Sequence, residues 1–420
     1  MHVLWFTGVQ LPAVTGAGLN RAGWQESLRK ALFRYYPDIK ISIASFGAED
    51  YQPFQAENAT YYNIYRQQGT ENRWKRMLES WKHRTYQEED LVQIIKTYDL
   101  VRPDLVFIFG TENPFGLVVD EFSVPSVISI QAVINGLVDS LFFGYTGRQL
   151  IKEFLSRQTL AGQGIFHKWW AYKKHARIES KIYRQNNYFC GRTQWDQQWM
   201  TELNPEARYF KINRVLREAF YTDEWMFADS SQNRIFSLCS NAPFKGGITL
   251  VRALVQLKEN GNDHFKLRLA GIDPDSSVGK TITEILRRNK MEHQVDLLGR
   301  LSPDQIKTEM KAARIFVLPS HMDNSPNSLA EAMILGMPCI ASNAGGISSM
   351  IQDGIDGLLY THTDIQALAQ RILLLNADHD LAQTLGGKAR ANALIRHDPS
   401  TIAEQTFAMY QQVLSTGGGQ

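Results

Sequence analysis

The feature that most constrains the fold is a regular alternation of short apolar runs with amphipathic segments. In the N-terminal half, helical patterns at residues 24–36 and 88–101 lie between the apolar runs. The runs are continuous and rich in β-branched and aromatic residues, which is typical of buried parallel strands. They cover residues 2–9, 41–47, 104–110 and 126–132. This half is predicted to be a doubly wound α/β domain.

The C-terminal half repeats the scheme with clearer turns. Amphipathic segments at 247–260 and 302–313 follow apolar runs at 234–240, 265–271, 295–300, 314–320 and 338–343. Two such halves predict two Rossmann-like domains that face one another across a cleft. We expect residues 1–215 to form the first domain and residues 216–398 the second, with the polar stretch 221–233 as the hinge. The last helix, about 399–415, is expected to pack back on the first domain.

Composition fits this prediction and excludes several other classes of protein. At 420 residues, with 44% hydrophobic and 21% charged residues and a net charge of +2, the chain is expected to form two globular domains. Its three cysteines lack metal-type spacing, which argues against a disulfide framework or a zinc site. No window reaches the roughly 18 apolar residues of a spanning helix, and the apolar N-terminus is interpreted as a strand. We therefore expect a cytoplasmic protein.

One stretch, DNSPNSLAEAM at 323–333, suggests a ligand site. It follows a predicted strand, and ligands of such sheets bind where strands run into helix N-termini. Ser325 is a natural N-cap and Pro326 suits the first helical turn, so the amides of Asn327 and Ser328 are expected to point outward. A helix N-terminus of this kind favours an anion such as a phosphate.

The same stretch holds two carboxylates, Asp323 and Glu331, which would repel a phosphate unless other groups engaged them. Carboxylates accept hydrogen bonds from hydroxyls, and sugars supply many hydroxyls. The stretch therefore suggests a ligand with a phosphate at its centre and a sugar on each side. A nucleotide-sugar has this composition.

Residues 318–360 resemble the donor-binding segment of retaining glycosyltransferases of family 4, which have the GT-B fold. The family has an acidic residue, seven residues, and then Glu before Ala-Met. Asp323 and Glu331 match that spacing, with Asp in place of the usual first Glu. The resemblance implies that Glu331 holds the ribose hydroxyls. It also implies that Asp323, with the amides near Ser325 and Asn327, faces the transferred sugar.

A second matching element lies at the end of the first strand of the C-terminal domain. Lys245 matches a lysine that neutralises the leaving diphosphate. The family's partner arginine is replaced here by Ser240, and Arg300 at another strand end could compensate for that loss. Gly345 and Gly346 fit either phosphate contact or tight-turn geometry.

The N-terminal half carries further candidates for a phosphate loop or an acceptor site. A glycine-rich loop follows the first strand, and the family's usual His at the end of residues 126–132 is Gln131 in this chain. Gln131 can bind a sugar hydroxyl but cannot transfer protons at neutral pH. GRTQWD (191–196) is similar to a motif in a subset of the family. The candidates here are Gly16, Gly18, Gly23, Gln131 and Arg192.

The resemblance implies transfer of a sugar, with retention of configuration, from a nucleoside-diphosphate sugar to an acceptor hydroxyl, in glycan or polysaccharide biosynthesis. The nucleotide-sugar is a co-substrate, and the family needs no metal or other cofactor. Two alternatives stay open. A sugar-nucleotide epimerase of the same fold would need protonatable groups around the sugar, and a non-catalytic nucleotide-sugar binding protein would fit the loss of the arginine at Ser240.

Charge is unevenly distributed along the chain. Residues 141–192 contain ten Lys/Arg and two Glu, a local charge of +8, and residues 166–175 interleave aromatic and basic side chains. The segment carries no nucleic-acid-binding motif, so nucleic acid is not an expected partner. Aromatic and basic side chains suit a lipid headgroup boundary. The sequence therefore predicts either a solvated helix face or a peripheral contact of residues 166–175 with the anionic inner face of a membrane, near a lipid-linked acceptor.

Overall fold

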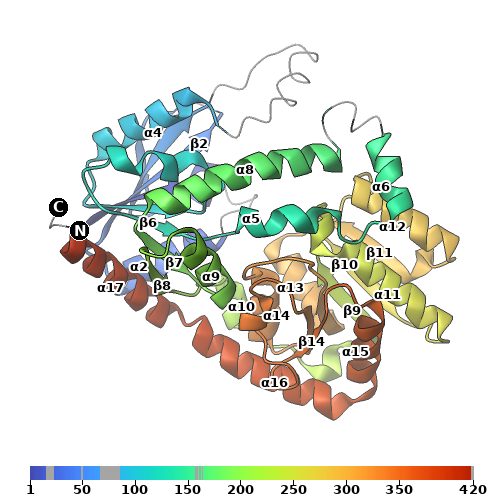
Figure 1. Ribbon diagram of the computed structural model, residues 1–420. Helices are drawn as coiled ribbons and strands as arrows, with labels where there is room; N and C mark the ends of the chain where they lie inside the picture. The colour runs from blue at the N-terminus through green and yellow to red at the C-terminus, as the bar shows by residue number, and fades with distance from the viewer. Residues whose placement is uncertain are drawn as a thin grey trace. The chain divides into compact units, whose positions relative to one another are not determined.

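The computed structural model describes residues 1–15, 23–48, 51–66, 86–156, 159, 162 and 164–417. The chain divides into two compact units (Figure 1). Unit 1 consists of Met1–Val138, Ile151–Val215 and His397–Gln420, and unit 2 of Asp139–Leu150 and Leu216–Arg396. Residues 139–150 thus cluster with unit 2, although the expected first domain included them. Helix α6 (Gly147–Phe154) contains the point where the chain passes back to unit 1.

Unit 1 is built on a sheet with the strand order β3-β4-β2-β1-β5-β6-β7-β8. All neighbouring strands pair in parallel except β3, which is antiparallel to β4. Four strands were not among those predicted, namely β3, β4, β7 and β8. The strands are β1 His2–Thr7, β2 Lys40–Gly47, β3 Phe54–Ala56, β4 Ala59–Tyr65, β5 Leu105–Phe109, β6 Ser126–Ser129, β7 Tyr188–Gly191 and β8 Arg208–Lys211.

Helices cover both faces of this sheet, and β1 shows how the two faces are filled. Val3 and Trp5 pack into one hydrophobic cluster, whereas Leu4 and Phe6 pack into the other, because successive side chains of a strand point to opposite faces. The C-terminal helix α17 contributes to the first cluster and contacts α2. The helices are α1 Pro12–Thr15, α2 Gly23–Tyr35, α4 Glu88–Val101, α5 Ile134–Leu137, α8 Ile165–Gln185, α9 Gln194–Leu203 and α17 Pro399–Gly417.

Unit 2 is built on an all-parallel sheet with the order β11-β10-β9-β12-β13-β14. Five of its strands lie at the predicted apolar runs, and the short β14 was not predicted. The strands are β9 Ser231–Leu238, β10 Lys266–Ala270, β11 Val295–Gly299, β12 Ala313–Leu318, β13 Cys339–Ser342 and β14 Leu358–Tyr360.

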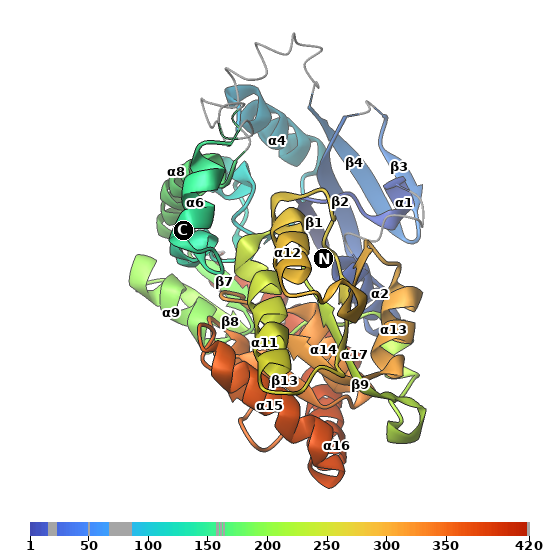
Figure 2. The ribbon, with the colours of Figure 1, turned by 90° about the vertical axis from the view of Figure 1, so that its right-hand side faces the viewer.

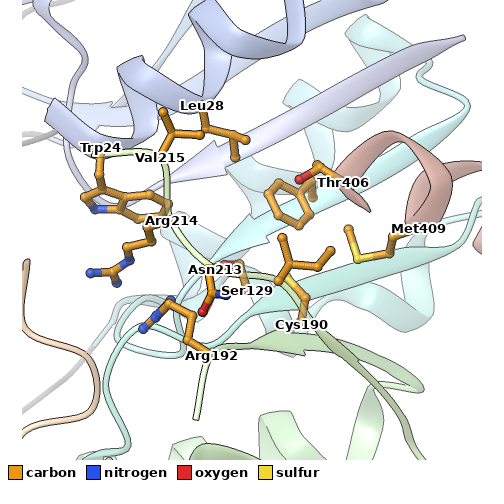
Figure 3. Close-up of a pocket in the computed structure, with 12 residues that line it drawn as sticks. Trp24, Leu28, Ser129, Cys190, Arg192, Asn213, Arg214, Val215, Thr406 and Met409 are labelled. Atoms are coloured by element: carbon orange, nitrogen blue, oxygen red, sulfur yellow. The ribbon is translucent and has the colours of Figure 1, made fainter. Parts of the chain in front are cut away.

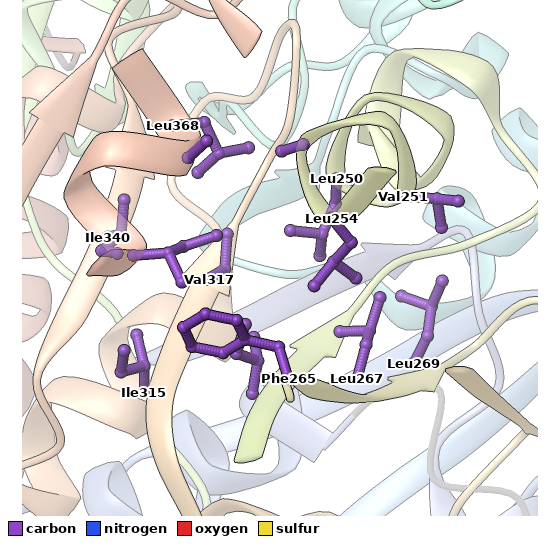
Figure 4. Packing of buried hydrophobic residues seen from close by; sticks show 14 of the residues in the cluster. Leu250, Val251, Leu254, Phe265, Leu267, Leu269, Ile315, Val317, Ile340 and Leu368 are labelled. Atoms are coloured by element: carbon purple, nitrogen blue, oxygen red, sulfur yellow. The ribbon is translucent and has the colours of Figure 1, made fainter. Parts of the chain in front are cut away.

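Two hydrophobic clusters cover the two faces of this sheet as well. On one face, α11 contacts both α12 and α15 (Figure 2), and its apolar side packs on strand residues such as Ile315 and Val317 (Figure 4). Helices α10, α13 and α14 contribute to the cluster on the other face. The helices are α10 Glu218–Tyr221, α11 Gly247–Glu259, α12 Ser277–Arg288, α13 Pro303–Ala312, α14 Asn327–Leu335, α15 Ile365–Ala377 and α16 His379–Arg396.

The predicted hinge at residues 221–233 is wrong, because this stretch belongs to unit 2. Trp225 is buried, and its indole N–H donates to the Ala313 carbonyl at 2.9 Å. Its backbone N–H donates to the Leu335 carbonyl at 2.7 Å. The short apolar run 225–228 lies between polar residues on both sides, so the sequence pattern conceals this tryptophan anchor. Besides the two crossings that flank residues 139–150, the chain passes between the units at Val215–Leu216 and Arg396–His397.

Among the described residues, no helix is both long enough and apolar enough to cross a membrane.

Candidate active site

The strand order of unit 2 identifies where a ligand would bind. From β9 the chain continues through β10 and β11 on one side of the sheet, whereas β12, β13 and β14 lie on the other side. The order therefore reverses between β9 and β12. In doubly wound sheets the ligand crevice lies at this switch point, outside the carboxyl ends of the strands. The loops after β9 and β12 carry Lys245 and Asp323, the two residues that the sequence singles out for catalysis.

These two side chains form an ion pair. The Lys245 ammonium donates to Asp323 Oδ2 at 2.5 Å, and the other carboxylate oxygen accepts from the Asn324 N–H at 3.1 Å. Both side chains remain partly exposed, at 29% for Lys245 and 14% for Asp323. The pair can therefore be reached by a ligand.

The loops that carry the pair are tied together by their backbones. Lys245 ends a short 3₁₀ turn (Pro243–Lys245), which Gly246 closes at a φ of 75°. A Cβ on Gly246 would lie 1.8 Å from the Pro319 carbonyl, so only glycine allows this approach. The His321 N–H then donates to the Phe244 carbonyl at 2.7 Å. These contacts fix the Lys245 loop against the loop that leads to Asp323.

Gly345 and Gly346 support the same loop from the side of β13. The Gly346 N–H donates to the Asp323 carbonyl at 2.9 Å. Gly345 has a φ of 59°, and a Cβ there would lie 2.3 Å from that same carbonyl. The tight-turn interpretation of the pair therefore has a physical reason, namely close packing against the backbone of Asp323. Contact with phosphate stays a prediction.

Helix α14 begins later than the sequence suggests. Its N-cap is Pro326, which makes no side-chain cap, so the prediction of Ser325 as the N-cap is wrong. Asn327 and Ser328 are the first helical residues, as expected for amides at a helix start. Within the described residues, the Ser328 N–H donates to no partner. This N–H adds a hydrogen-bond donor for an anion to the positive end of the helix dipole.

Glu331 is more enclosed than a ligand-binding carboxylate is expected to be. It is 2% exposed, and both its oxygens accept from the Arg217 guanidinium, Oε1 from Nε at 2.7 Å and Oε2 from Nη2 at 2.6 Å. Burial raises the pKa of the Glu331 carboxyl, and Arg217 opposes that rise. The expected role of Glu331 in holding ribose stays a prediction. To bind Glu331, ribose would have to share the carboxylate with Arg217 or displace the Arg217 guanidinium from it.

Two donor-site candidates remain, Ser240 and Arg300. Ser240 has a local structural role, and Arg300 lies apart from the ion pair. Ser240 Oγ accepts from the Ala242 N–H at 3.2 Å and so stabilises the turn that leads to Lys245. Arg300 is exposed after β11, and β10 lies between β11 and β9. Neighbouring strands lie about 4.8 Å apart, so β11, which precedes Arg300, lies about 10 Å from β9, which precedes Lys245. The structure does not bring it to the pair.

His321 lies two residues before Asp323 and is engaged on both ring nitrogens. Nε2 lies 2.8 Å from the Thr249 hydroxyl, and Nδ1 lies 3.2 Å from Nδ1 of His362. Burial, aided by His362 and Arg252, lowers the pKa of His321 to about 4. The neutral ring is therefore held in place by Thr249 and His362, next to the loop that leads to Asp323.

Unit 1 has its own cluster at the strand ends. The Gln131 carbonyl accepts from Arg192 Nη2 at 3.0 Å, and Gln131 Oε1 accepts from the Arg214 guanidinium. Arg214 Cζ lies 4.3 Å from the centre of the Trp24 ring. Figure 3 shows Trp24, Arg192 and Arg214 on one side of a pocket, opposite Thr406 and Met409 of α17. The structure thus brings Gln131 and Arg192 together, as two neighbouring strand ends should.

Other predicted and unpredicted residues lie at this edge. Gly23 begins α2, whereas Gly16 and Gly18 lie outside the described residues. Glu112 follows β5, and its Oε1 accepts from the Ala132 N–H at 3.1 Å. Burial raises the pKa of Glu112 to about 7. This carboxyl therefore titrates near neutrality beside Gln131.

Sequence reasoning missed Glu112, Arg214 and Arg217. Glu112 had a usable signal, because it follows a predicted strand at a sheet edge where ligands bind. Arg214 and Arg217 belong to no recognised motif. Their partners, Gln131 and Glu331, lie far away in the sequence. Among the described residues, no group of three or more His, Cys, Asp or Glu could hold a metal ion. The absence of a metal requirement stays a prediction.

Residues 227–392, which hold the ion pair and its supporting loops, match the family described as Glycosyl transferases group 1. This matched part of unit 2 is called the group 1 domain below. Two curated relatives of this group 1 domain are the amylovoran biosynthesis glycosyltransferase AmsK of Erwinia amylovora and the N-acetyl-alpha-D-glucosaminyl L-malate synthase of Bacillus anthracis. The first is 30% identical over 40% of this chain and 39% of its own, and the second 29% identical over 36% and 38%. The match thus spans about two fifths of each relative.

Solved structures extend the likeness from the group 1 domain to the whole fold. The sucrose-phosphate synthase of Thermosynechococcus elongatus has a TM-score of 0.73 at 17% identity and covers 99% of both chains. Anabaena HepE in complex with UDP-glucose has a TM-score of 0.67 at 15% identity, covering 98% of this chain and 100% of its own. At such identities the likeness shows the fold alone. The fold is GT-B, with two Rossmann-like domains, as predicted.

Proposed function

We propose that this protein is a retaining glycosyltransferase that moves a sugar from a nucleoside-diphosphate sugar to an acceptor hydroxyl. The observation that carries the proposal is the Lys245–Asp323 ion pair at the switch point of the group 1 domain. One member of the pair can neutralise a diphosphate and the other can accept hydrogen bonds from a sugar. A role in glycan or polysaccharide synthesis is supported by the curated relatives, one of which is an amylovoran biosynthesis glycosyltransferase.

In the proposed reaction the donor diphosphate binds at the start of α14. The Ser328 amide and the helix dipole attract its negative charge, and Lys245 neutralises the charge that develops as the glycosidic bond breaks. Asp323 lies next to Lys245 and so would face the sugar. The leaving phosphate takes the proton of the acceptor hydroxyl on the same face of the sugar, and the configuration is therefore retained. No protein base and no metal is required by this scheme.

The acceptor, a glycan or a lipid-linked sugar, is proposed to bind at the carboxyl edge of the unit 1 sheet. Gln131, Arg192 and Arg214 supply hydrogen-bond donors there, and Trp24 supplies a flat apolar surface. We place the enzyme in the cytoplasm, with residues 166–175 contributing to a peripheral contact with the anionic inner face of a membrane.

The experiment is turnover with a panel of UDP-, GDP- and ADP-sugars, each followed by release of the nucleoside diphosphate. The anomeric configuration of the product is read by proton NMR. Wild type should release diphosphate from one class of donor and give a product with the donor's own configuration. Lys245→Ala should lose most of that turnover. Binding without turnover would favour a binding protein instead, and an inverted product would contradict retention.

A further inference from the structure

The exposed side of α8 carries a continuous line of positive charge. Lys168, Lys173, Arg177, Lys181 and Arg184 are all exposed, and the last four are spaced by three or four residues, so they share one side of the helix. Within the described residues, none of the five forms an ion pair. These five residues are called the cation stripe below. They extend beyond residues 166–175, where sequence alone suggested a membrane contact.

The acidic residue of α8 does not offset this charge at the surface, because it lies on the opposite side. Glu179 is 0% exposed. Its carboxylate accepts from the Thr111 hydroxyl at 2.6 Å and from the N–H groups of Ile134 and Asn135 at 2.9 and 2.7 Å. Glu179 therefore anchors α8 to the start of α5, and the exposed side of the helix carries no acidic residue.

An exposed apolar patch lies at one end of the stripe. Ile151, Phe154 and Leu155 are 62%, 58% and 71% exposed, and Trp170 on α8 is 53% exposed. The first three fall on one side of the turn that ends α6, because their spacing is three and four residues. The Phe154 ring packs edge-on against Phe166 of α8, with centroids 5.3 Å apart. This contact joins the apolar patch to the basic helix.

We propose that the cation stripe and the apolar patch form one surface that binds an anionic bilayer, with α8 lying in the membrane plane. The stripe would contact lipid phosphates. The patch would insert between headgroups, where Trp and aliphatic side chains are favoured. A soluble polyanion such as RNA would satisfy the charges but would leave the exposed Ile and Leu in water. The inference deepens the proposed membrane contact and is independent of the proposed reaction, because vesicle binding is measured without donor or acceptor.

The test is co-sedimentation with phosphatidylcholine vesicles, with and without phosphatidylglycerol. The stripe variant is Lys173→Gln, Arg177→Gln and Lys181→Gln. Its control, Lys96→Gln, Arg287→Gln and Lys388→Gln, removes the same charge from exposed positions elsewhere. Each basic residue near an anionic membrane surface raises the affinity for that membrane about fivefold. The stripe variant, which lacks three of them, should therefore bind anionic vesicles about a hundredfold more weakly. The control should stay close to wild type, because charges beyond about 10 Å are screened at 0.1 M salt.

A second pair of variants tests insertion. Ile151→Gln with Leu155→Gln should weaken vesicle binding about tenfold, because the apolar area can no longer be buried. Leu100→Gln with Ile395→Gln changes two other apolar residues, 65% and 77% exposed, and should have little effect. Circular dichroism verifies that all four variants fold. The proposal is overturned if wild type ignores anionic vesicles at low salt, if a variant and its control bind alike, or if RNA competes fully with the vesicles.

Discussion

The Lys245 ammonium lies 2.5 Å from the Asp323 carboxylate, and this contact bridges the loops after the two strands at the switch point of unit 2. A partly exposed pair of this kind contributes at most about 1 kcal/mol to stability. We therefore interpret the pair as functional. In the proposed reaction, the pair holds the lysine at the diphosphate and keeps the carboxylate beside the sugar.

Replacing Asp323 separates these two roles. Asp323→Asn removes a negative charge beside the diphosphate and frees Lys245 from its partner, so affinity for free nucleoside diphosphate should rise about threefold or more. Turnover of the intact donor should fall, because the carboxylate no longer faces the sugar. Calorimetric titration and steady-state kinetics measure the two effects. A variant with weakened diphosphate affinity and normal turnover would show that Asp323 only supports the loop.

Gly345 tests how the Asp323 loop is held. Gly345→Ala forces a side chain into a φ of 59° and against the Asp323 carbonyl. We expect a loss of about 1–3 kcal/mol in the free energy of unfolding, together with reduced turnover. Gly387→Ala is the control, because nothing lies within 4 Å of its Cβ position in α16. It should be neutral or stabilising by about 1 kcal/mol in urea denaturation. Equal effects at the two glycines would contradict the close packing.

The Glu331–Arg217 pair should contribute to the fold as well as to the ligand site. Removing one partner of a buried pair leaves the other unsatisfied, which costs about 3 kcal/mol or more. We therefore expect Glu331→Gln and Arg217→Gln each to destabilise the protein, and the double variant to lose less than their sum. A double-mutant cycle by urea denaturation measures this coupling. Purely additive losses would mean that the two side chains act independently.

Ribose binding by Glu331 can be measured on the folded fraction of the same variants. Nucleoside diphosphate affinity should fall in Glu331→Gln. Unchanged affinity would remove Glu331 from the donor site.

His321 should make the free energy of unfolding depend on pH within a defined range. Its folded pKa of about 4 lies below the ordinary 6.5, so the unfolded state binds more protons between these values. Stability from this group is fully present above about pH 6.5 and is lost as pH falls towards 4. His321→Gln should lose less unfolding free energy than wild type between pH 7 and pH 5, in urea titrations. Parallel losses would mean that His321 titrates normally.

Much of the fold could be predicted because unit 2 has clear strand patterns. Its buried parallel strands are continuous apolar runs, such as the run at 314–320 that contains most of β12. The strands that were missed are short or half polar. β8, with the sequence RYFK, has no buried residue, and β14 has three residues. Such strands depend on their neighbours in the sheet, which no local pattern reveals.

The site could be predicted only in part, because its contacts also depend on residues that are far apart in the sequence. Lys245 and Asp323 each follow a strand, so the sheet brings them together, but their direct pairing depends on the approach of Gly246 to Pro319. Arg217 lies 114 positions from Glu331, and only the folded chain joins them. The N-cap was misplaced by one residue because a Ser-Pro pair fits a helix start in either register.

The measurement that tests the central claim most directly is calorimetric titration of UDP, GDP and ADP into wild type and Lys245→Gln, with Lys388→Gln as the control. Lys388 is an exposed lysine with no described partner. The account predicts that wild type and the control bind one of the three diphosphates alike, and that Lys245→Gln binds it at least about tenfold more weakly. With the matching donor sugar, the Lys245 change should lower kcat more than it raises KM, because charge builds on the diphosphate in the transition state. Equal diphosphate affinity in wild type and Lys245→Gln, or no binding of any of the three by wild type, would contradict the account.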